Sequence, residues 1–348
     1  MATRRIAVVP ELAMKAAQIS KPGADFEIVE REVPKPAAGQ VRIKVQACGV
    51  CHSDVFTKEG SWPGIQYPRV PGHEVAGVID EVGAGVSAWK KGQRVGVGWH
   101  GGQDNTCREC RRGDFRNCRN VKIPGISYDG GYQQYMVAPV EALVAIPETL
   151  HDAEAAPLLC AGITTYNALR HSGALPGDLV AVQGIGGLGH LGVQYAKKMG
   201  FRTIAIGFGP DKEHLAPKLG AHVYIDAKAE DAGAALQKLG GADVILATAP
   251  SGAAIASLLA GLSVRGKLVV VGVSGDPIPV NGVPLIFGGR SVIGSLTGRA
   301  IEMQDTLDFS VLTDVRPMIE TLPLEKAEEA YRRMMSGEAR FRMVLTMV

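Results

Sequence analysis

The stretch Leu179-Val-Ala-Val-Gln-Gly184-Ile-Gly186-Gly187-Leu188-Gly189 decides the fold class of this chain. An apolar run typical of a buried strand leads into closely spaced glycines, and residues 188–199 then have the pattern of a helix. Glycine permits a tight turn and lets the backbone approach a pyrophosphate, while the helix N-terminus presents free N–H groups and a favourable dipole to that anion. The stretch therefore predicts a dinucleotide-binding turn formed by Gly184, Gly186, Gly187, Leu188 and Gly189.

Alternating strands and helices follow this turn. Apolar runs predict strands at Thr203–Ile206, Val244–Ala247 and Lys267–Val271, and helices are expected over Lys212–Leu219 and Ser251–Leu262. Such alternation is typical of parallel βαβ units, so the predicted fold class is α/β with a doubly wound parallel sheet. A glycine-rich turn without a ligand is the alternative. The strand before the motif, the helix behind it and the units downstream are the context that a dinucleotide site requires.

The residues before this region have a different pattern. From residue 14 to about 150, short β-type runs alternate with glycine and proline, which predicts a compact β-rich domain. The pattern changes near residue 155, within a helix expected over Asp152–Arg170. The last fifty residues contain one clear amphipathic helix, Leu324–Met335, and a final strand, Phe341–Val348. The β-type runs in the first part are Val41–Val45, Glu74–Val82 and Gln93–Val97.

Composition excludes several classes of protein. The 348 residues are 46% hydrophobic and 21% charged, with a net charge of +2, which is ordinary for a globular protein of about two domains. No apolar run reaches the roughly 18 residues of a membrane span, and no basic run is dense enough to indicate nucleic-acid binding. Residues 1–13 read as a loose extension without the apolar core of a signal peptide, so a soluble cytoplasmic protein is expected.

Cysteine spacing predicts a first metal site. In a large chain without a signal peptide, clustered cysteines favour metal binding over disulfides. The pattern Asp104-x2-Cys107-x2-Cys110-x7-Cys118 can wrap one tetrahedral zinc with protein ligands at every position. A carboxylate oxygen is an acceptable zinc ligand, so Asp104 is predicted as the fourth. The alternative is that Asp104 is a solvated loop acid and that His100, water or no group completes the site.

A second set of possible ligands is dispersed along the chain: Cys51, His73 and Cys160. Three protein ligands leave one position open for water or substrate, which is the arrangement of a catalytic zinc. Their spacing alone does not link them, and a single histidine or cysteine is more often structural.

Three segments around these residues resemble the zinc-dependent medium-chain dehydrogenase/reductase superfamily. Gly72-His73-Glu74-Val-Ala-Gly77-Val-Ile-Asp-Glu-Val-Gly83-Ala-Gly-Val86 resembles its zinc-binding signature. Cys48-Gly-Val-Cys51-His52-Ser53-Asp54 is similar to the segment around the first catalytic ligand in yeast-type alcohol dehydrogenases, and Pro157-Leu-Leu-Cys160-Ala-Gly-Ile-Thr164 resembles the third. The segment from Asp104 to Cys118, called the cysteine lobe below, lies where this family carries a structural zinc. The resemblance covers residues 14–348 in the family's order.

The resemblance implies a fold and a division of the chain. A GroES-like β-rich domain with both zinc sites would span residues 1–154, a Rossmann domain for the cofactor would span 155–297, and residues 298–348 would return to the first domain. The active site would be the cleft between the two domains, and the protein would be a homo-oligomer, a tetramer or a dimer.

The resemblance also implies roles at the catalytic zinc. Cys51 rather than Cys48 would be the ligand because it alone precedes His-Ser-Asp, and Cys48 would be a small buried residue. Glu74 would be the acid beside the zinc, and Asp54 would orient His73. The resemblance extends to the cofactor and the substrate pocket: His52 and Arg342 would meet the pyrophosphate, Thr164 and Val273 would lie in the cofactor site, Lys212 would lie near the adenosine ribose, and Trp62 and Trp99 would line the pocket.

The implied reaction is hydride transfer between a small primary alcohol or aldehyde and a nicotinamide dinucleotide. Zinc would favour loss of the alcohol proton and would polarise the carbonyl in reverse, with Ser53 accepting the proton. Related enzymes often end this proton path in a histidine five residues after the first ligand. Phe56 stands there and cannot transfer a proton, so we expect the proton to leave through His52 or solvent. The alternative is that Phe56 merely packs the cofactor ribose.

Cofactor preference depends on the end of the second Rossmann strand, where NAD-specific enzymes place an acid on the ribose 2′-OH. Gly207 occupies that position, so the charge that normally excludes NADP is missing. Phe208 follows it, so an arginine to hold the 2′-phosphate is missing as well. We therefore expect two zinc ions per chain and relaxed cofactor selectivity, with NAD(H) favoured over NADP(H). The rival functions are a zinc-dependent polyol dehydrogenase, a zinc-free quinone reductase and a non-enzymatic zinc-binding module.

Overall fold

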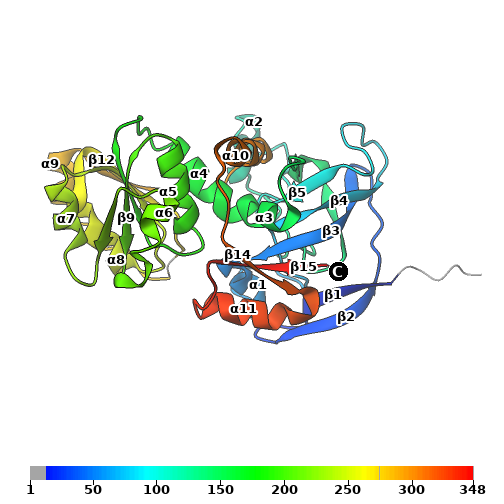
Figure 1. Cartoon of the computed structure of the whole chain (residues 1–348). Helices are drawn as coiled ribbons and strands as arrows, with labels where there is room; N and C mark the ends of the chain where they lie inside the picture. The colour runs from blue at the N-terminus through cyan, green and yellow to red at the C-terminus, as the bar shows by residue number, and fades with distance from the viewer. Residues whose placement is uncertain (1–12, 274, 348) are drawn as a thin grey trace, which may run out of the picture.

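The computed structural model describes residues 13–273 and 275–347. Of the extension predicted over residues 1–13, residues 1–12 lie outside the described part of the chain. The two larger of the three sheets in the described residues stand side by side, a parallel sheet in the middle of the chain and a largely antiparallel sheet built from both of its ends (Figure 1). None of the described helices is long and apolar enough to cross a membrane.

The parallel sheet has six strands in the order β10-β9-β8-β11-β12-β13. Every neighbouring pair is parallel. The chain reverses direction across the sheet between β8 and β11, and this switch point is where doubly wound sheets bind ligands. The predicted α/β class is confirmed. The strands are β8 (Leu179–Gln183), β9 (Arg202–Gly207), β10 (Val223–Asp226), β11 (Ala242–Ala247), β12 (Leu262–Val270) and β13 (Ser291–Gly294).

Helices link these strands, and two are shorter than predicted. The helix expected over Lys212–Leu219 is a 3-10 turn followed by α6 (Ala216–Leu219), because Pro217 has no N–H and is best tolerated in a first helical turn. In place of the helix expected over Ser251–Leu262, the structure has a short helix, α8 (Gly252–Ala256), followed by a 3-10 turn. The remaining links are α5 (Gly189–Lys198), α7 (Ala232–Lys238) and α9 (Gly282–Gly288).

The second sheet has the order β14-β15-β3-β4-β5-β7, with β6 also paired to β3. Its C-terminal strands return from the parallel sheet, and β15 runs antiparallel to β3 with Met343 opposite Val50. This return was expected from the family resemblance, whereas several short strands were not predicted. The strands are β3 (Gln40–Val50), β4 (Val75–Val82), β5 (Arg94–Val97), β6 (Tyr135–Pro139), β7 (Leu143–Ala145), β14 (Ile319–Pro323) and β15 (Arg342–Thr346), and β1 (Ala13–Ile19) pairs separately with β2 (Phe26–Glu32).

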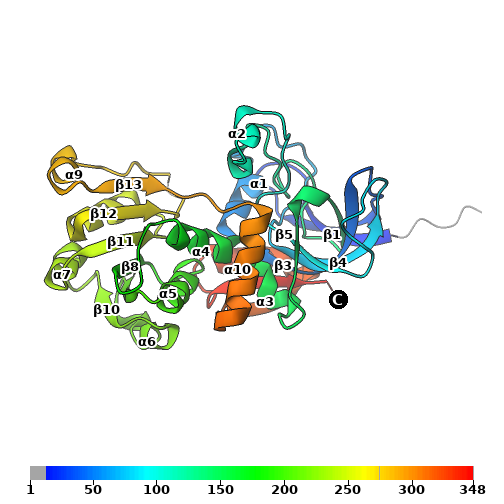
Figure 2. The ribbon, with the colours of Figure 1, turned by 90° about the horizontal axis from the view of Figure 1, so that it is seen from above.

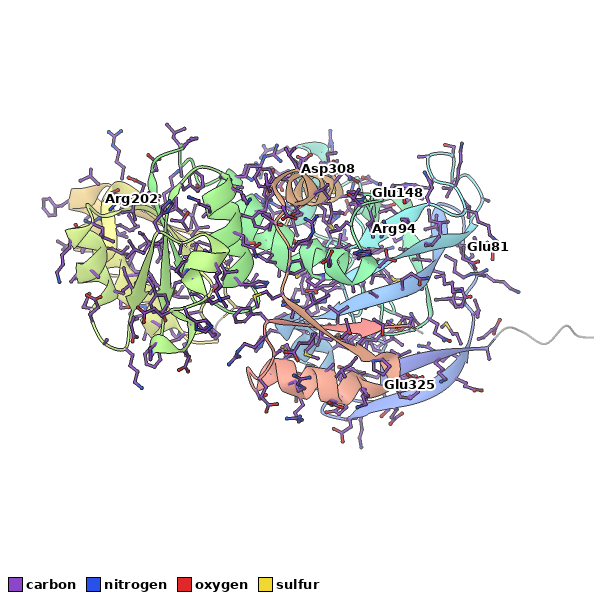
Figure 3. All side chains as sticks on the ribbon, in the orientation of Figure 1. Glu81, Arg94, Glu148, Arg202, Asp308 and Glu325 are labelled. Carbon is purple, nitrogen blue, oxygen red and sulfur yellow. The ribbon has the colours of Figure 1, made fainter. Side chains whose placement is uncertain are left out.

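A helical segment joins the two sheets. The helix predicted over Asp152–Arg170 is divided by a π-helical turn at Leu158–Gly162, which separates α3 (Asp152–Pro157) from α4 (Ile163–Arg170). Arg94 on β5, labelled in Figure 3, anchors the start of this segment. Its guanidinium donates to the carbonyls of Pro147 and Leu150 and to the Asp152 carboxylate, at 2.6–2.9 Å.

Helix α10 (Ala300–Thr313) was missed by the sequence analysis, which expected a single helix in the last fifty residues, now α11 (Ala327–Met335). Figure 2 shows α10 crossing the junction of the two sheets. Gln304 accepts a hydrogen bond from the backbone of Ala145 in β7, and Asp305 pairs with Arg170 in α4. Because the helix contacts both parts and also exposes apolar residues, its sequence lacks a single apolar stripe.

His190, the second residue of α5, ties the glycine-rich turn to the chain that enters β14. The imidazole is fully buried. Its Nδ1 lies 2.8 Å from the carbonyl of Gly186, and its Nε2 accepts from the backbone N–H of Met318 at 3.1 Å. This pattern requires the neutral ring, and burial lowers the pKa of His190 to about 4 from the ordinary 6.5.

A pH-dependent stability follows. The unfolded chain takes up a proton near pH 6.5 and the folded chain only near pH 4, so the unfolding free energy should fall as the pH drops through this range. The full loss is roughly 3 kcal/mol, since one pKa unit corresponds to about 1.4 kcal/mol. His190→Gln should remove this component. Urea unfolding of both proteins at pH 7 and pH 5 should show a smaller pH slope in the variant, and equal slopes would contradict the assignment.

Candidate active site and metal centres

Four potential metal ligands meet where the two sheets join. One ligand atom from each of Cys51, His73, Glu74 and Cys160 lies within 4.8 Å of all the others. Cys51 directly follows β3, and His73 and Glu74 directly precede β4. Cys160 comes from the π-helical turn. The structure therefore brings together the dispersed set that spacing alone could not connect.

The geometry of this cluster fits a tetrahedral zinc. The Sγ atoms of Cys51 and Cys160 are 3.8 Å apart, and two sulfur ligands about 2.3 Å from a tetrahedral ion lie about 3.8 Å apart. Nε2 of His73 is buried with no hydrogen-bond partner among the described residues, although buried polar atoms rarely stay unpaired. The hydrogen bond between the two thiols lowers the pKa of Cys51 and raises the pKa of Cys160, so Cys51 is the one that more readily becomes the thiolate form that binds metals.

The Asp54 carboxylate stands behind two of these ligands. Its Oδ1 lies 3.3 Å from Nδ1 of His73. Its Oδ2 accepts hydrogen bonds from the backbone N–H of Cys51 at 2.9 Å and from the hydroxyl of Tyr132 at 2.8 Å. Asp54 therefore has the position expected of a residue that orients His73. Tyr132 was not singled out from the sequence, where a tyrosine after two glycines carries no chemical signature.

Glu74 connects the cluster to the C-terminal return. Its side chain is fully buried and pairs with Arg342 of β15. Burial raises the pKa of Glu74 to about 7, although the positive charge of Arg342 opposes this shift. Its second oxygen, Oε2, has no partner among the described residues, so it could meet an ion in the cluster.

Arg342 also lies against the glycine-rich turn. A Cβ atom at Gly187 would be 3.0 Å from a terminal nitrogen of Arg342, and Nε of Arg342 is buried without a hydrogen-bond partner in the described part of the chain. The guanidinium thus stands between Glu74 and the predicted pyrophosphate site, and its contact with the cofactor stays a prediction.

The second predicted metal site also forms a cluster. Ligand atoms of Asp104, Cys107, Cys110 and Cys118 lie within 4.8 Å of one another, and Sγ of Cys107 and Cys118 are 3.9 Å apart. His100, the alternative fourth ligand, is outside this group. The Asp104 carboxylate accepts the backbone N–H groups of Cys107 and Thr106 and the amide of Asn120, at 2.7–2.9 Å. These donors hold the pKa of Asp104 below its ordinary value.

Aromatic rings cover one side of the Cys51–His73–Cys160 cluster. Trp99 meets the His73 ring edge-on at 4.9 Å between ring centroids. Trp62 lies 6.0 Å from Trp99, and Phe56 lies 5.4 Å from Trp62 and 6.3 Å from Trp99. Phe56 is therefore part of this aromatic wall, a position that the sequence analysis did not consider. Three isoleucines missed by that analysis complete the group: Ile65, Ile123 and Ile126.

The glycine-rich turn has the close packing that its sequence predicts. Gly184 has a positive φ of 82°. A Cβ atom at Gly189 would lie 1.5 Å from the carbonyl oxygen of Gly184, so only glycine fits there. The hydroxyl of Thr248, at the end of β11, donates to the carbonyl of Gln183 at 2.6 Å and closes the switch point. Among the other residues predicted for the cofactor site and the proton path, Thr164 is buried, Ser53 is partly buried, and His52 and Val273 are exposed.

The end of β9 gives a reason for the missing acid. A Cβ atom at Gly207 would lie 2.0 Å from the hydroxyl of Tyr224, which donates to the carbonyl of Gly209 at 2.5 Å. The Tyr224 ring therefore fills the space that an acidic side chain would need. Phe208 is 79% exposed, and the ammonium of Lys212 lies 5.3 Å above the Phe341 ring, where burial lowers its pKa.

Comparison with known proteins connects these sites to named families. Residues 37–148 match the family described as "Alcohol dehydrogenase GroES-like domain", and residues 187–311 match "Zinc-binding dehydrogenase". Alcohol dehydrogenase patD of Penicillium expansum is 45% identical over 333 residues, covering 96% of this chain and 97% of that protein.

Two solved structures are similar over nearly the whole chain. The protein named CAD from Helicobacter pylori, complexed with NADP(H), has a TM-score of 0.86 and 29% identity, covering 97% of this chain and 98% of that chain. The acetophenone reductase from Geotrichum candidum in complex with NAD has a TM-score of 0.85 and 27% identity, covering 98% and 99%.

Substitution of Asp104 tests its role as a ligand. Asp104→Asn keeps an oxygen for the N–H groups of Thr106 and Cys107 but removes the negative charge that a zinc ligand supplies. We expect Asp104→Asn and Asp104→Ala to lose one zinc per chain on dialysis against a weak chelator, and Asp104→Cys to keep it. Asp114→Ala, an acid of the same lobe outside the cluster, is the control. Full zinc retention by Asp104→Asn would reduce Asp104 to a loop acid.

Proposed function

As a member of the zinc-binding alcohol dehydrogenases of the medium-chain dehydrogenase/reductase superfamily, this chain is an oxidoreductase, and we propose that it transfers hydride between a small primary alcohol or aldehyde and a nicotinamide dinucleotide. The observation that carries this proposal is the position of Arg342. This side chain pairs with Glu74 in the candidate metal cluster and also lies against Gly187 in the dinucleotide turn. Two sites that a hydride transfer needs are therefore next to each other.

We propose Cys51, His73 and Cys160 as the ligands of a catalytic zinc, with Asp104, Cys107, Cys110 and Cys118 holding a structural one. When bound, the catalytic zinc supplies Lewis acidity that favours loss of the alcohol proton, and the nicotinamide supplies the hydride acceptor. Ser53, one residue before Asp54, takes the proton, and the exposed His52 passes it to solvent. Asp54 holds His73 in position for this chemistry.

A non-enzymatic zinc-binding module, one of the rival functions, would account for the cysteine lobe alone. It leaves unexplained why a second cluster of ligands lies beside a glycine-rich turn at the switch point of a parallel sheet. A zinc-free reductase is likewise disfavoured, because such an enzyme has no use for three converging ligands. Polyol dehydrogenases usually have an acid where Cys160 stands, so we place this chain among alcohol dehydrogenases and keep the residue limits 1–154, 155–297 and 298–348 as its proposed domains.

We propose that the aromatic wall selects small, unbranched substrates. Phe56, Trp62 and Trp99 are large rings that contact one another edge-on, so they leave little room for movement. Pockets of this kind discriminate by about 1–3 kcal/mol per methylene, which corresponds to a tenfold to 200-fold preference. We therefore expect primary alcohols and aldehydes to be used more efficiently than bulky ketones.

Cys51→Ala with Cys48→Ala as its control tests the function. Cys48 is fully buried close to Cys51 in sequence but lies outside the ligand cluster. Wild type and Cys48→Ala should contain two zinc ions per chain and oxidise primary alcohols with a nicotinamide dinucleotide. Cys51→Ala should fold, keep one zinc and show no turnover. Equal activity of both variants, or equal efficiency of wild type on primary and secondary alcohols, would contradict the proposal.

We propose relaxed cofactor selectivity with NADH preferred. The hydroxyl of Tyr224 donates its hydrogen to Gly209, so towards the ribose it can only accept. A neutral acceptor suits a ribose 2′-OH and does not suit a 2′-phosphate, which needs donors, yet it exerts no charge repulsion. Two similar structures, one complexed with NADP(H) and one with NAD, support this proposal.

The exposed Phe208 offers a test of this selectivity. Phe208→Arg should raise kcat/KM for NADPH relative to NADH by roughly tenfold, since an arginine can pair with the 2′-phosphate. Phe208→Leu removes the ring without adding charge and should leave the ratio unchanged. Strict NADPH dependence of the unmutated enzyme would overturn the preference for NADH.

We also propose a homo-oligomer. Among the described strands β13 pairs only with β12, so its other edge is unpaired. Beside this edge, Ile286 and Phe287 of α9 are 76% and 87% exposed, and Ile293 of β13 is also exposed. Exposed apolar surface next to an unpaired edge favours association with a second copy. Sedimentation of a single-chain species at micromolar concentration would contradict this proposal.

A further inference from the structure

Tyr132 places a phenol hydroxyl against the acid behind the candidate catalytic zinc. The residue is fully buried. Its hydroxyl donates to Oδ2 of Asp54 at 2.8 Å, across 78 residues of sequence. A buried tyrosine hydroxyl needs a partner, because an unpaired one costs roughly 1–3 kcal/mol, and here that partner is the carboxylate that faces His73.

The two oxygens of Asp54 have different tasks. Oδ2 receives the hydroxyl of Tyr132 and the backbone N–H of Cys51, while Oδ1 faces Nδ1 of His73. Two donors on one oxygen fix the rotation of the carboxylate about its Cβ–Cγ bond. This rotation decides whether Oδ1 can accept a hydrogen bond from the Nδ1–H group of His73. When the proton is held on Nδ1, Nε2 is free to bind a metal. The hydroxyl of Tyr132 therefore contributes to the orientation of His73 indirectly, through the carboxylate of Asp54.

A second contact places Tyr132 beside His73 through the backbone. A Cβ atom at Gly72 would lie 2.5 Å from Cδ1 of the Tyr132 ring, so the ring occupies the space next to the residue that precedes His73. The N–H of Tyr132 also donates to the carbonyl of Pro71 at 3.0 Å. The ring and the hydroxyl thus reach the same ligand by independent routes.

Packing alone does not account for this residue. The Tyr132 ring contacts Phe26 at 5.7 Å between centroids, and a phenylalanine would fill the same volume. A hydroxyl buried among these apolar side chains without a hydrogen-bond partner would destabilise the fold. Its alignment with Oδ2 of Asp54 is the feature that a phenylalanine could not supply.

We propose that Tyr132 is a positioning residue for the catalytic zinc, acting through Asp54 to hold His73 in its metal-binding orientation. This inference rests on the proposed function, in which Cys51, His73 and Cys160 bind that zinc. It predicts that removing the hydroxyl loosens one metal ion and leaves the ion of the cysteine lobe unchanged. Outer partners of metal ligands typically change metal affinity by 10–100-fold.

The test measures zinc transfer from the holoenzyme to a chromogenic chelator. Tyr132→Phe should release one of its two zinc ions about tenfold faster than wild type. Tyr224→Phe is the matched control, because the Tyr224 hydroxyl also makes a hydrogen bond, to the carbonyl of Gly209, at the β9–β10 edge of the parallel sheet and outside both ligand clusters. It should release both ions at wild-type rates. The Cys51→Ala variant should hold only the zinc ion of the cysteine lobe, so its release rate identifies the rate of release from that lobe.

A cycle with Asp54→Asn tests the route. If Tyr132 acts through Asp54, the double variant should release zinc no faster than Asp54→Asn alone, and independent, multiplicative effects would overturn the proposal. The absorption bands of cobalt at the catalytic site should also shift in Tyr132→Phe. Unchanged release and unchanged bands in a folded Tyr132→Phe protein would reduce the residue to packing. Equal zinc content of wild type and Cys51→Ala would instead refute the proposed function itself.

Discussion

The buried ion pair between Glu74 and Arg342 is the interaction on which the candidate active site depends. Their side chains are 0% and 6% exposed, so neither charge is solvated by bulk water. Removing one partner from such a pair costs roughly 3–5 kcal/mol, because the other charge is left buried and unpaired. Arg342 reaches Glu74 only because β15 returns from the parallel sheet and pairs with β3 beside the cluster. The pair therefore requires that both parts of the chain have folded and docked.

The π-helical turn at Leu158–Gly162 has a comparable function on the opposite side. A regular helix from Asp152 to Arg170 would have presented Cys160 at a different angle, because one extra residue in a turn rotates every side chain that follows. Here the turn places Sγ of Cys160 3.8 Å from Sγ of Cys51. The segment that contains it is anchored by Arg94 before the turn and by the Arg170–Asp305 pair after it. Irregular helical turns of this kind are frequent at functional sites.

The two ends of the proposed substrate and cofactor path differ in chemistry. At the metal end, Phe56, Trp62 and Trp99 form an apolar wall on one side of a buried polar cluster. At the adenosine end, Tyr224 and Gly207 replace the usual acid with a neutral hydroxyl. The first arrangement restricts size, and the second leaves charge selection weak. Neither effect can be deduced from a single position, since each depends on a ring contributed by another element.

The sequence alone determined the features that local physics controls. The apolar run before Gly184 and the glycines behind it predicted the dinucleotide turn, because the positive φ at Gly184 favours glycine and the contact at Gly189 leaves no room for a Cβ atom. The spacing of Asp104, Cys107, Cys110 and Cys118 likewise predicted one compact cluster, since a short loop keeps its own residues close. For Cys51, His73 and Cys160, only the family resemblance joined residues that their spacing left apart.

Tertiary structure decided everything that depends on distant residues meeting. It brought Tyr132 to Asp54, Tyr224 to Gly207, Phe56 to the two tryptophans and Arg342 to Glu74. It also decided that α10 is a helix that crosses the junction of the two sheets (Figure 2), and that the helix around Cys160 contains a π turn. No periodicity marks such residues, because burial and hydrogen bonding against a remote element depend on how whole sheets dock, and that geometry is set by the three-dimensional packing of the complete chain.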